Sequence, residues 1–394
     1  MDLVLKRLAR RRRELDRLRA AFAGAVALAL LTAWMLDASP ARAAFPGENG
    51  PIACGGVRGG EPDIEIFQIN PDGSGEMLLT TNAVRDGSPA YSPDGTKIAF
   101  ESQRHNVPGE PPNTEIYVAN NDGDLEGPDV RRLTFNDGSL SNGTKNELAA
   151  TDFSPSWSPD GTEIVFHSGR ETTFDDGGTS PVRDFEIYKM SAVTGESVTP
   201  ATRLTRKRGQ DAVPSWSPDG TKIAFQGFPA GNDSTRFPVN LEVFTMNPDG
   251  SEITNVSNSP GTPNDPATTV NENANALDRD IIWSPDSRQI AYSSTRASTV
   301  AGNQNFDVWR ADRDGSNPVR LTSNPDSPIP EPFTDFDVPL VWSPDGTKIL
   351  FASSRESTVA ADVFSAYTMD ARTGDTGPGS VQRVASVAQF QRCD

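Results

Sequence analysis

The chain has 394 residues with a formal net charge of −18, 35% apolar residues, 33 glycines and 32 prolines. This composition excludes a coiled coil or a protein built on long helices, and it is typical of many short strands joined by tight turns. The acidity lies in the body of the chain, because residues 1–43 are net basic. An acidic body repels phosphate backbones, so we expect no nucleic-acid partner.

The first 43 residues have the order of a secretory signal. A basic start that includes Arg10 to Arg13 precedes 17 mostly apolar residues from Ala20 to Leu36, and Ala41-Arg42-Ala43 supplies the small residues of a cleavage site. This order predicts a signal peptide that is cleaved after Ala43. The alternative is an uncleaved membrane anchor, since 17 residues are at the lower limit of a span. Both interpretations place residues 44–394 outside the cytoplasm, where disulfides form.

A short motif recurs through the body of the chain. An aromatic residue followed by Ser-Pro-Asp and then Gly or Ser begins at Tyr91, Trp157, Trp216, Trp283 and Trp342, at spacings of 66, 59, 67 and 59 residues. An apolar run such as Lys97 to Phe100 follows each copy, and a second run such as Glu115 to Val118 usually follows that. A Leu-Thr pair such as Leu133-Thr134 closes most units. Repetition at this period, with four short strands in each unit, predicts the blades of a propeller.

The repeats predict an all-β fold, a six-bladed β-propeller with four-stranded blades. The expected units are residues 44–85, 86–150, 151–209, 210–276, 277–336 and 337–394. The first unit lacks the motif and therefore its leading strand. Ser-Pro-Asp-Gly is a hairpin-turn sequence, because proline sets φ to about −65° and glycine accepts a positive φ. A calcium loop at Asp312 to Gly315 is excluded, since no acidic residue occupies the closing position of such a loop.

Two columns of charged residues accompany the repeat. An aspartate lies five residues before each aromatic residue, and an arginine lies thirteen residues after four of them. The aspartates are Asp86, Asp152, Asp211, Asp278 and Asp337, and the arginines are Arg104, Arg170, Arg296 and Arg355, with Arg58 equivalent in the first unit. Pro229 takes the arginine position in the fourth unit. Folding each hairpin about its turn brings both columns to the same end.

These columns have two interpretations. The first is a set of ion pairs between neighbouring blades, because repeated units make repeated contacts with their neighbours. The second is a charged mouth of the central channel that binds an amine, a metal ion or a partner's terminus. The Gly-, Pro-, Asn- and Thr-rich loops at residues 172–183 and 258–276 are a further candidate for recognition.

Two cysteines occupy the two ends of the repeat region. Cys54 ends the second strand of the first unit, and Cys393 is the penultimate residue. Counting along the last unit places Cys393 at the entrance of the strand that the first unit lacks. We therefore expect a Cys54–Cys393 disulfide that closes the ring.

The sequence offers few residues for catalysis. Only two histidines occur, His105 and His167, which excludes a three-histidine metal site. No Gly-x-Ser-x-Gly nucleophile motif is present, and no carboxylate pair is singled out for acid–base work. We expect no enzymatic activity, no cofactor and no metal.

The pattern Trp-Ser-Pro-Asp-Gly-Thr-x-Ile-x-Phe, followed by Glu-Ile-Tyr and Arg-Leu-Thr, resembles the TolB-type repeat, also called the WD40-like or PD40 repeat. The resemblance extends over nearly all of residues 46–385 and implies a six-bladed propeller. In Gram-negative bacteria it implies a periplasmic protein that binds the peptidoglycan-associated lipoprotein. The α/β domain that precedes the propeller in TolB proteins has no counterpart here, so we do not carry over the Tol contacts. Prolyl oligopeptidase-like peptidases and oligogalacturonate lyases have similar repeats, but their hydrolase domain and histidine-rich metal site are not matched.

Together these features predict an exported, monomeric, non-catalytic propeller in the bacterial cell envelope or outside the cell. Its expected partner is an envelope protein or peptide of unknown identity, and the membrane is involved only if the N-terminal segment stays uncleaved. The alternative is a hydrolase or lyase that acts on peptide or polysaccharide at the propeller funnel, with the aspartate column and His105 or His167 in the site.

Overall fold

The computed structural model describes residues 50–57, 63–70, 74–106, 113–135, 151–170, 185–207, 209–228, 241–257, 277–296, 306–323, 336–354, 365–375, 381–386 and 392–393. The chain divides into two compact units, and every described residue lies in the second, Ser39–Asp394. Among the described residues, no helix is both long enough and apolar enough to cross a membrane.

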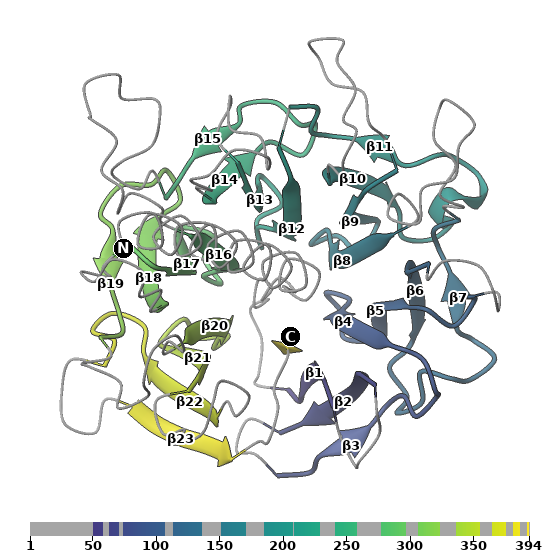
Figure 1. Ribbon diagram of the computed structural model, residues 1–394, viewed down its shortest axis with the longest axis horizontal. Coiled ribbons are helices and arrows are strands. Elements are labelled where there is room, and N and C mark those ends of the chain that lie inside the picture. Colours follow the sequence, from purple (N-terminus) through teal and green to yellow (C-terminus); the bar gives the residue numbers. More distant parts are fainter. Residues whose placement is uncertain are drawn as a thin grey trace, which may run out of the picture. The chain divides into compact units, whose positions relative to one another are not determined.

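Six four-stranded antiparallel sheets form a ring of blades, which confirms the predicted fold (Figure 1). Blade 1 contains β24 (Arg392–Cys393), β1 (Ile52–Gly56), β2 (Glu65–Ile69) and β3 (Met77–Leu78). Blade 2 contains β4 (Asp86–Tyr91), β5 (Lys97–Ser102), β6 (Glu115–Asn120) and β7 (Arg131–Arg132). Blade 3 contains β8 (Asp152–Trp157), β9 (Glu163–Ser168), β10 (Glu186–Ser191) and β11 (Thr202–Arg203), with the short 3-10 helix η1 (Gly195–Ser197) between the last two.

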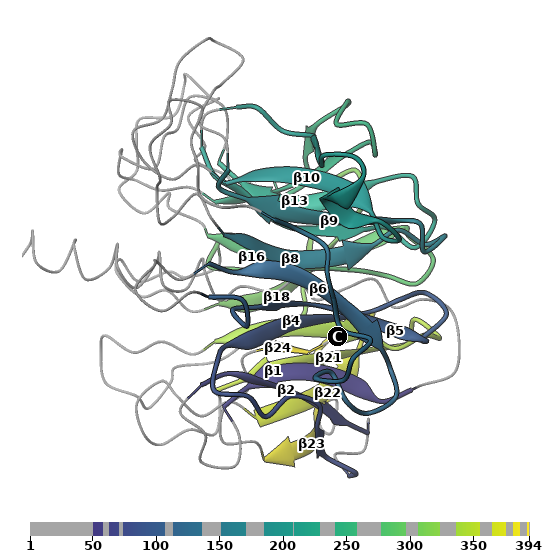
Figure 2. The ribbon, with the colours of Figure 1, turned by 90° about the vertical axis from the view of Figure 1, so that its right-hand side faces the viewer.

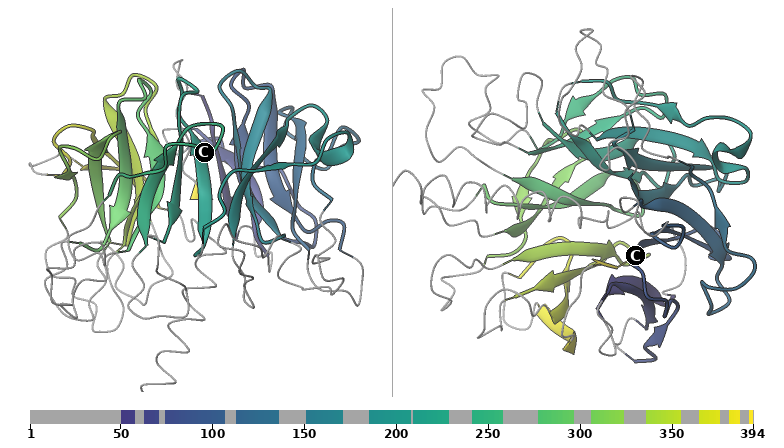
Figure 3. Two further views of the ribbon diagram at one scale, coloured as in Figure 1. Left: turned by 90° about the horizontal axis from the view of Figure 1, so that it is seen from above. Right: turned by 45° about the vertical axis from the view of Figure 1, so that its right-hand side comes forward.

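The remaining blades follow the same order. Blade 4 contains β12 (Asp211–Trp216), β13 (Ile223–Gly227), β14 (Glu242–Met246) and β15 (Thr254–Asn255). Blade 5 contains β16 (Asp278–Trp283), β17 (Gln289–Ser294), β18 (Asp307–Asp312) and β19 (Val319–Arg320). Blade 6 contains β20 (Asp337–Trp342), β21 (Lys348–Ser353), β22 (Ser365–Asp370) and β23 (Val381–Ser386). Figure 1 shows β4, β8, β12, β16 and β20 innermost in the ring, and Figures 2 and 3 show the same sheets from other sides.

The recurring motif is the hairpin turn between the first two strands of a blade. In blade 3, Gly161 has a φ of +70° and its N–H donates to the Ser158 carbonyl at 2.9 Å. The Asp160 carboxylate accepts from the Ser158 hydroxyl at 2.6 Å and from the N–H and hydroxyl of Thr162 at 3.0 and 2.8 Å. The same bonds recur around Asp345, where those from Ser343 and Thr347 lower the pKa of the carboxyl to about 2. The motif therefore encodes a turn whose every side chain has a local structural task.

Each innermost strand of blades 2 to 6 contains an irregularity near its third residue. The register with the second strand shifts there, and in blades 2 to 5 the third residue has a positive φ; these residues are Ser88, Ser154, Val213 and Asp280. A β-bulge of this kind turns one peptide group away from its own ladder. The freed N–H of Ser154 donates to Glu101 of blade 2 at 3.0 Å, and that of Val213 donates to His167 Nδ1 of blade 3 at 3.4 Å. The bulges thus join neighbouring blades.

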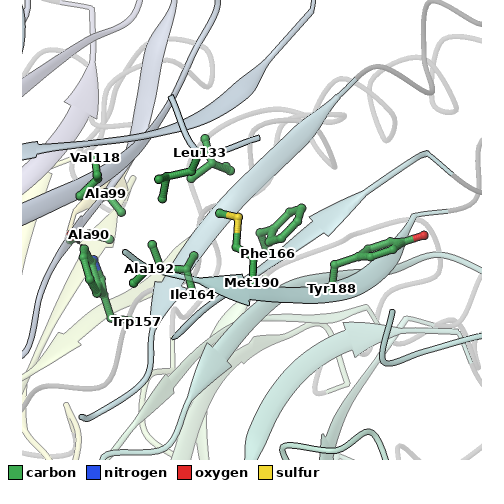
Figure 4. Close-up of a cluster of buried hydrophobic side chains, with 11 residues drawn as sticks. Ala90, Ala99, Val118, Leu133, Trp157, Ile164, Phe166, Tyr188, Met190 and Ala192 are labelled. Atoms are coloured by element: carbon green, nitrogen blue, oxygen red, sulfur yellow. Dashed lines mark hydrogen bonds between the residues drawn. The ribbon is translucent and has the colours of Figure 1, made fainter. Parts of the chain in front are cut away.

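The hydrophobic core is divided among the seams between blades. Each of the six buried clusters in the described part of the chain draws its residues from two neighbouring blades. Figure 4 shows the cluster of blades 2 and 3, in which Trp157 lies beside Ala90 and Ile164. The Trp157 indole N–H donates to the Ala90 carbonyl at 3.0 Å. The aromatic residue of the motif therefore holds its blade against the preceding one.

A second turn contributes to four of the seams. The glycine between the third and fourth strands lies against a backbone carbonyl of the preceding blade, so that a Cβ on Gly250 would be 2.6 Å from the Leu204 oxygen. Gly195, Gly315 and Gly374 make the same approach to Leu133, Val256 and Leu321, and all four glycines have positive φ. The Leu-Thr pair that closes each unit supplies this carbonyl in three of the four seams.

The C-terminus completes blade 1, as predicted. β24 pairs antiparallel with β1, and Cys54 and Cys393 are partners in the register. Cys54 is fully buried in a cluster that also contains Leu340, Leu350 and Ala352 of blade 6. The last strand in the sequence therefore occupies the innermost position of the first blade, which closes the ring without a break in the repeat.

Candidate functional site

The predicted aspartate and arginine columns meet at the start of the innermost strands. Arg104 lies 3.1 Å from Asp86, and Arg170 and Arg296 lie 2.6 and 2.8 Å from Asp152 and Asp278. Folding each hairpin about its turn produces these pairs, since each aspartate begins the first strand and each arginine follows the second. The prediction that the columns share one end of the blade is confirmed for these three blades.

Each arginine is held on several sides. The guanidinium of Arg104 lies over the rings of Phe100 and Tyr117, with its carbon 4.8 and 5.2 Å from their centroids. Its Nε donates to the Ser102 hydroxyl at 2.8 Å. Arg170 and Arg296 are held in the same way, each by a serine and by two aromatic rings of its own blade. We call this arrangement of aspartate, arginine, serine and two rings the clasp.

The clasp joins strands of one blade, whereas one sequence interpretation placed the ion pairs between blades. The reason is the hairpin: the aspartate begins its first strand and the arginine follows its second strand, so the two residues meet within one blade. The contact with the neighbour is secondary. Arg296 donates to the Ser257 carbonyl of blade 4 at 3.1 Å, and Arg170 pairs with Glu196 of η1, whose N–H bonds to Leu133 of blade 2.

The side chains of the five aspartates are buried, and burial affects the ionisation of their carboxyl groups. The exposed fraction is 0% for Asp86, Asp152, Asp278 and Asp337 and 6% for Asp211. Burial raises the pKa of Asp86, and Arg104 opposes that effect. Asp86, Asp152 and Asp278 are thus both buried and paired with an arginine of their own blade.

Blade 4 departs from the clasp in two linked positions. Pro229 replaces the arginine in sequence, and Gly227 replaces the serine. A Cβ on Gly227 would lie 2.3 Å from an Asp211 carboxylate oxygen, so this carboxylate occupies the space that the serine fills elsewhere. Arg58, Pro229 and Arg355 lie outside the described residues, as do the loops at 172–183 and 258–276.

The sequence interpretation missed a second set of buried carboxylates, at or near the start of the third strands. Glu186 accepts from Arg203 of the fourth strand at 2.5 Å and from the Thr205 hydroxyl at 2.5 Å. Glu115 has the same contacts with Arg132 and Thr134, and Asp307 lies 2.8 Å from Arg320. The signal was present, because Glu-Ile-Tyr and Arg-Leu-Thr belong to the repeat, but spacing alone does not reveal that their charged residues meet.

The two sets of carboxylates approach each other across each seam. The N–H of Asp152 donates to the carbonyl of Thr114, next to Glu115 of the preceding blade, at 2.8 Å. Burial and the nearby Asp152 raise the pKa of Glu115, while Thr134 and Arg132 oppose them. The seam between blades 2 and 3 therefore brings two buried carboxylates close together, and each is paired with an arginine of its own blade.

Both histidines are occupied with packing. His167 is 1% exposed and lies between the rings of Phe153 and Phe185, with centroids 5.5 and 5.1 Å away. His105 stacks on Tyr117, whose hydroxyl lies 2.6 Å from Nδ1. In the part of the chain that the structure describes, no three His, Cys, Asp or Glu side chains are grouped so that they could hold a metal ion.

No family model matches the chain. An uncharacterised protein of Agrobacterium fabrum is 28% identical over 163 residues, which are 41% of this chain and 46% of that protein. The match thus spans about half the length of this curated relative.

Two solved structures share the fold. TolB from Acinetobacter baumannii superposes with a TM-score of 0.55 at 18% identity, over 89% of this chain and 66% of that one. A putative TolB from Agrobacterium tumefaciens gives 0.53 at 16% identity, over 86% and 91%. The chain is a six-bladed β-propeller with the fold of the TolB proteins.

Proposed function

We propose that this chain is an exported, non-catalytic propeller that serves as a scaffold for a protein or peptide partner in the bacterial cell envelope. The observation that carries the proposal is the burial of the clasp. The aspartates of the repeat are buried, and in blades 2, 3 and 5 each pairs with an arginine of its own blade. Repeated charged residues that are buried in this way support a structural role for the clasp, and we place the recognition surface at other residues.

The proposed location rests on the order of basic, apolar and small residues in positions 1–43. The two cysteines support it. Cys54 and Cys393 are cross-strand partners where the ring closes, and we propose that they form a disulfide, which requires an oxidising compartment.

Photo-crosslinking in intact cells tests the scaffold role. A crosslinking residue is placed in the full-length chain at Arg288, which is 84% exposed on a hairpin turn, at Val198, which is 73% exposed beside η1, or at Thr179 in one of the sequence-predicted loops. We expect an adduct of defined size from one of these positions and not from all three, since a partner covers one face. Cell fractionation of the same samples reports the compartment.

Two results would overturn the proposal. The first is a chain that remains in the cytoplasm. The second is turnover of peptide or polysaccharide substrates by the purified protein, lost on replacing His105 or His167 with Gln, together with the absence of any adduct. That outcome would support the hydrolase or lyase alternative.

A further inference from the structure

The seam between blades 1 and 2 has a different charge balance from its neighbours. In blades 2, 3 and 5 the fourth strand supplies an arginine to the carboxylate of the third strand; the residues are Arg132, Arg203 and Arg320. In blade 1 the equivalent position is Leu78, because Leu78 pairs with Phe67 as Arg132 pairs with Tyr117. Glu65 therefore begins its strand without the arginine that Glu115 has.

Glu65 is buried close to other carboxyl groups. Its exposed fraction is 0%, and no lysine or arginine forms an ion pair with it within the described segments. Asp63, Asp86 of blade 2 and Glu126 of the loop after β6 are the charged groups that act on it, and all three are acidic.

The other neighbours of Glu65 bring no charge. Thr80 offers a hydroxyl, and Gly56, its partner on β1, has no side chain. Across the seam Arg104 is already paired with Asp86. Within the described residues, Glu65 and Asp86 are both fully buried in this seam, and Arg104 is paired with Asp86.

A buried carboxylate without a counter-charge is costly, so the group takes up a proton instead. We propose that Glu65 makes the seam between blades 1 and 2 a proton-linked joint, which tightens when Glu65 is protonated and loosens when it loses its proton. The joint lies next to the blade that closes the ring, where Asp86 N–H donates to the Ile64 carbonyl at 2.9 Å.

The direction of the effect follows from linkage. Burial raises the pKa of Glu65 from 4.5 to about 7, with Asp86, Asp63 and Glu126 adding to the shift and Thr80 opposing it. Because the folded chain then binds a proton more tightly than the unfolded chain, the stabilisation is complete below pH 4.5 and is lost as the pH rises through about 7.

Thermal unfolding of the full chain between pH 5 and pH 8 tests the proposal. Glu65→Gln keeps the shape of the side chain and removes the titration. We expect the same melting temperature as the wild type near pH 5 and one several degrees higher at pH 8. Glu252→Gln is the matched control, since it removes the same charge from a side chain that is 71% exposed, and it should follow the wild type at both pH values.

A second variant tests the same joint by adding a positive charge beside Glu65. Leu78→Arg supplies the arginine that blade 2 has, and it should reduce the difference in melting temperature between pH 5 and pH 8 even if packing losses lower both values. Hydrogen exchange at the Asp86 amide, corrected for its intrinsic pH dependence, should show opening at pH 8 in the wild type and protection in Glu65→Gln.

Three outcomes would overturn the proposal. Parallel pH profiles for the wild type and Glu65→Gln would mean that Glu65 does not titrate in this range. An equal gain from Glu252→Gln would assign the effect to the general acidity of the surface. Stabilisation of the wild type by Ca²⁺ at pH 8 that disappears in Glu65→Gln would mean that a cation, and not a proton, balances the seam.

Discussion

At the scale of single residues, the charged side chains of the clasp stabilise the blade. Arg296 is 9% exposed, pairs with the buried Asp278 and lies over the rings of Tyr292 and Trp309. A buried ion pair of this kind adds little over an apolar replacement of the whole group. Breaking it from one side, however, leaves the partner charge buried without compensation.

This asymmetry makes a prediction for the clasp of blade 5. Arg296→Met keeps much of the contact with the rings but strands the Asp278 carboxylate, and we expect a loss of about 3–5 kcal/mol in the free energy of unfolding. Arg288→Met is the control, because Arg288 is 84% exposed in the same blade and should change stability by less than about 0.5 kcal/mol. Urea unfolding of both variants measures the difference. Equal midpoints for the two variants would show that the clasp is dispensable.

Gly227 marks the blade in which the clasp is absent. Blade 4 lacks both the serine and the arginine of the clasp, and the Asp211 carboxylate lies where a Cβ at position 227 would be. The Asp211 carboxylate can lie there only because position 227 has no side chain. Sequence inspection finds the missing arginine, whereas the significance of the glycine requires the coordinates.

At the scale of elements, the turns between the third and fourth strands lock one blade onto the next. Gly250 has a φ of +85° and approaches the Leu204 carbonyl, while Gly95 has a φ of +68° and open space where a Cβ would be. An alanine at position 95 would therefore introduce backbone strain alone, whereas an alanine at position 250 would introduce backbone strain and a steric contact.

We expect Gly95→Ala to lower the free energy of unfolding by about 1–2 kcal/mol, the cost of the left-handed conformation alone. Gly250→Ala should cost more than that, because its Cβ would meet a backbone oxygen at 2.6 Å that cannot move without separating blades 3 and 4. Urea unfolding of the two variants in parallel gives the comparison. A smaller loss for Gly250→Ala than for Gly95→Ala would contradict the assigned role of this turn.

At the scale of the whole molecule, six separate clusters replace one central core, and each joins two blades. A ring built in this way gains its last seam only when the chain ends meet. β24 makes that closure by pairing with β1, where Cys393 is opposite Cys54 and Arg392 is opposite Gly55. A covalent link between Cys54 and Cys393 would fix the closing strand to β1.

The proposed disulfide closes a loop of several hundred residues, for which the chain-entropy account gives a stabilisation of about 4–5 kcal/mol. We expect Cys393→Ser to lower the melting temperature under oxidising conditions and reduced wild type to match it. The direct measurement is thiol alkylation in denaturant without reductant. Two reactive thiols in the exported protein would contradict the link.

The sequence by itself determined the fold, because the turn motif, the strand runs and the closing Leu-Thr pair each perform a local task that recurs with the repeat. It also placed Cys393 beside Cys54 and brought the aspartate and arginine columns to one end, since a hairpin fixes both relations. Only the tertiary structure decided that the ion pairs lie within blades and that their carboxylates are buried. It also showed that the carboxylates of the third strands meet arginines of the fourth strands, and that Leu78 takes the arginine position beside Glu65. These properties depend on contacts between strands and between blades, whose distances and burial no spacing along the chain encodes.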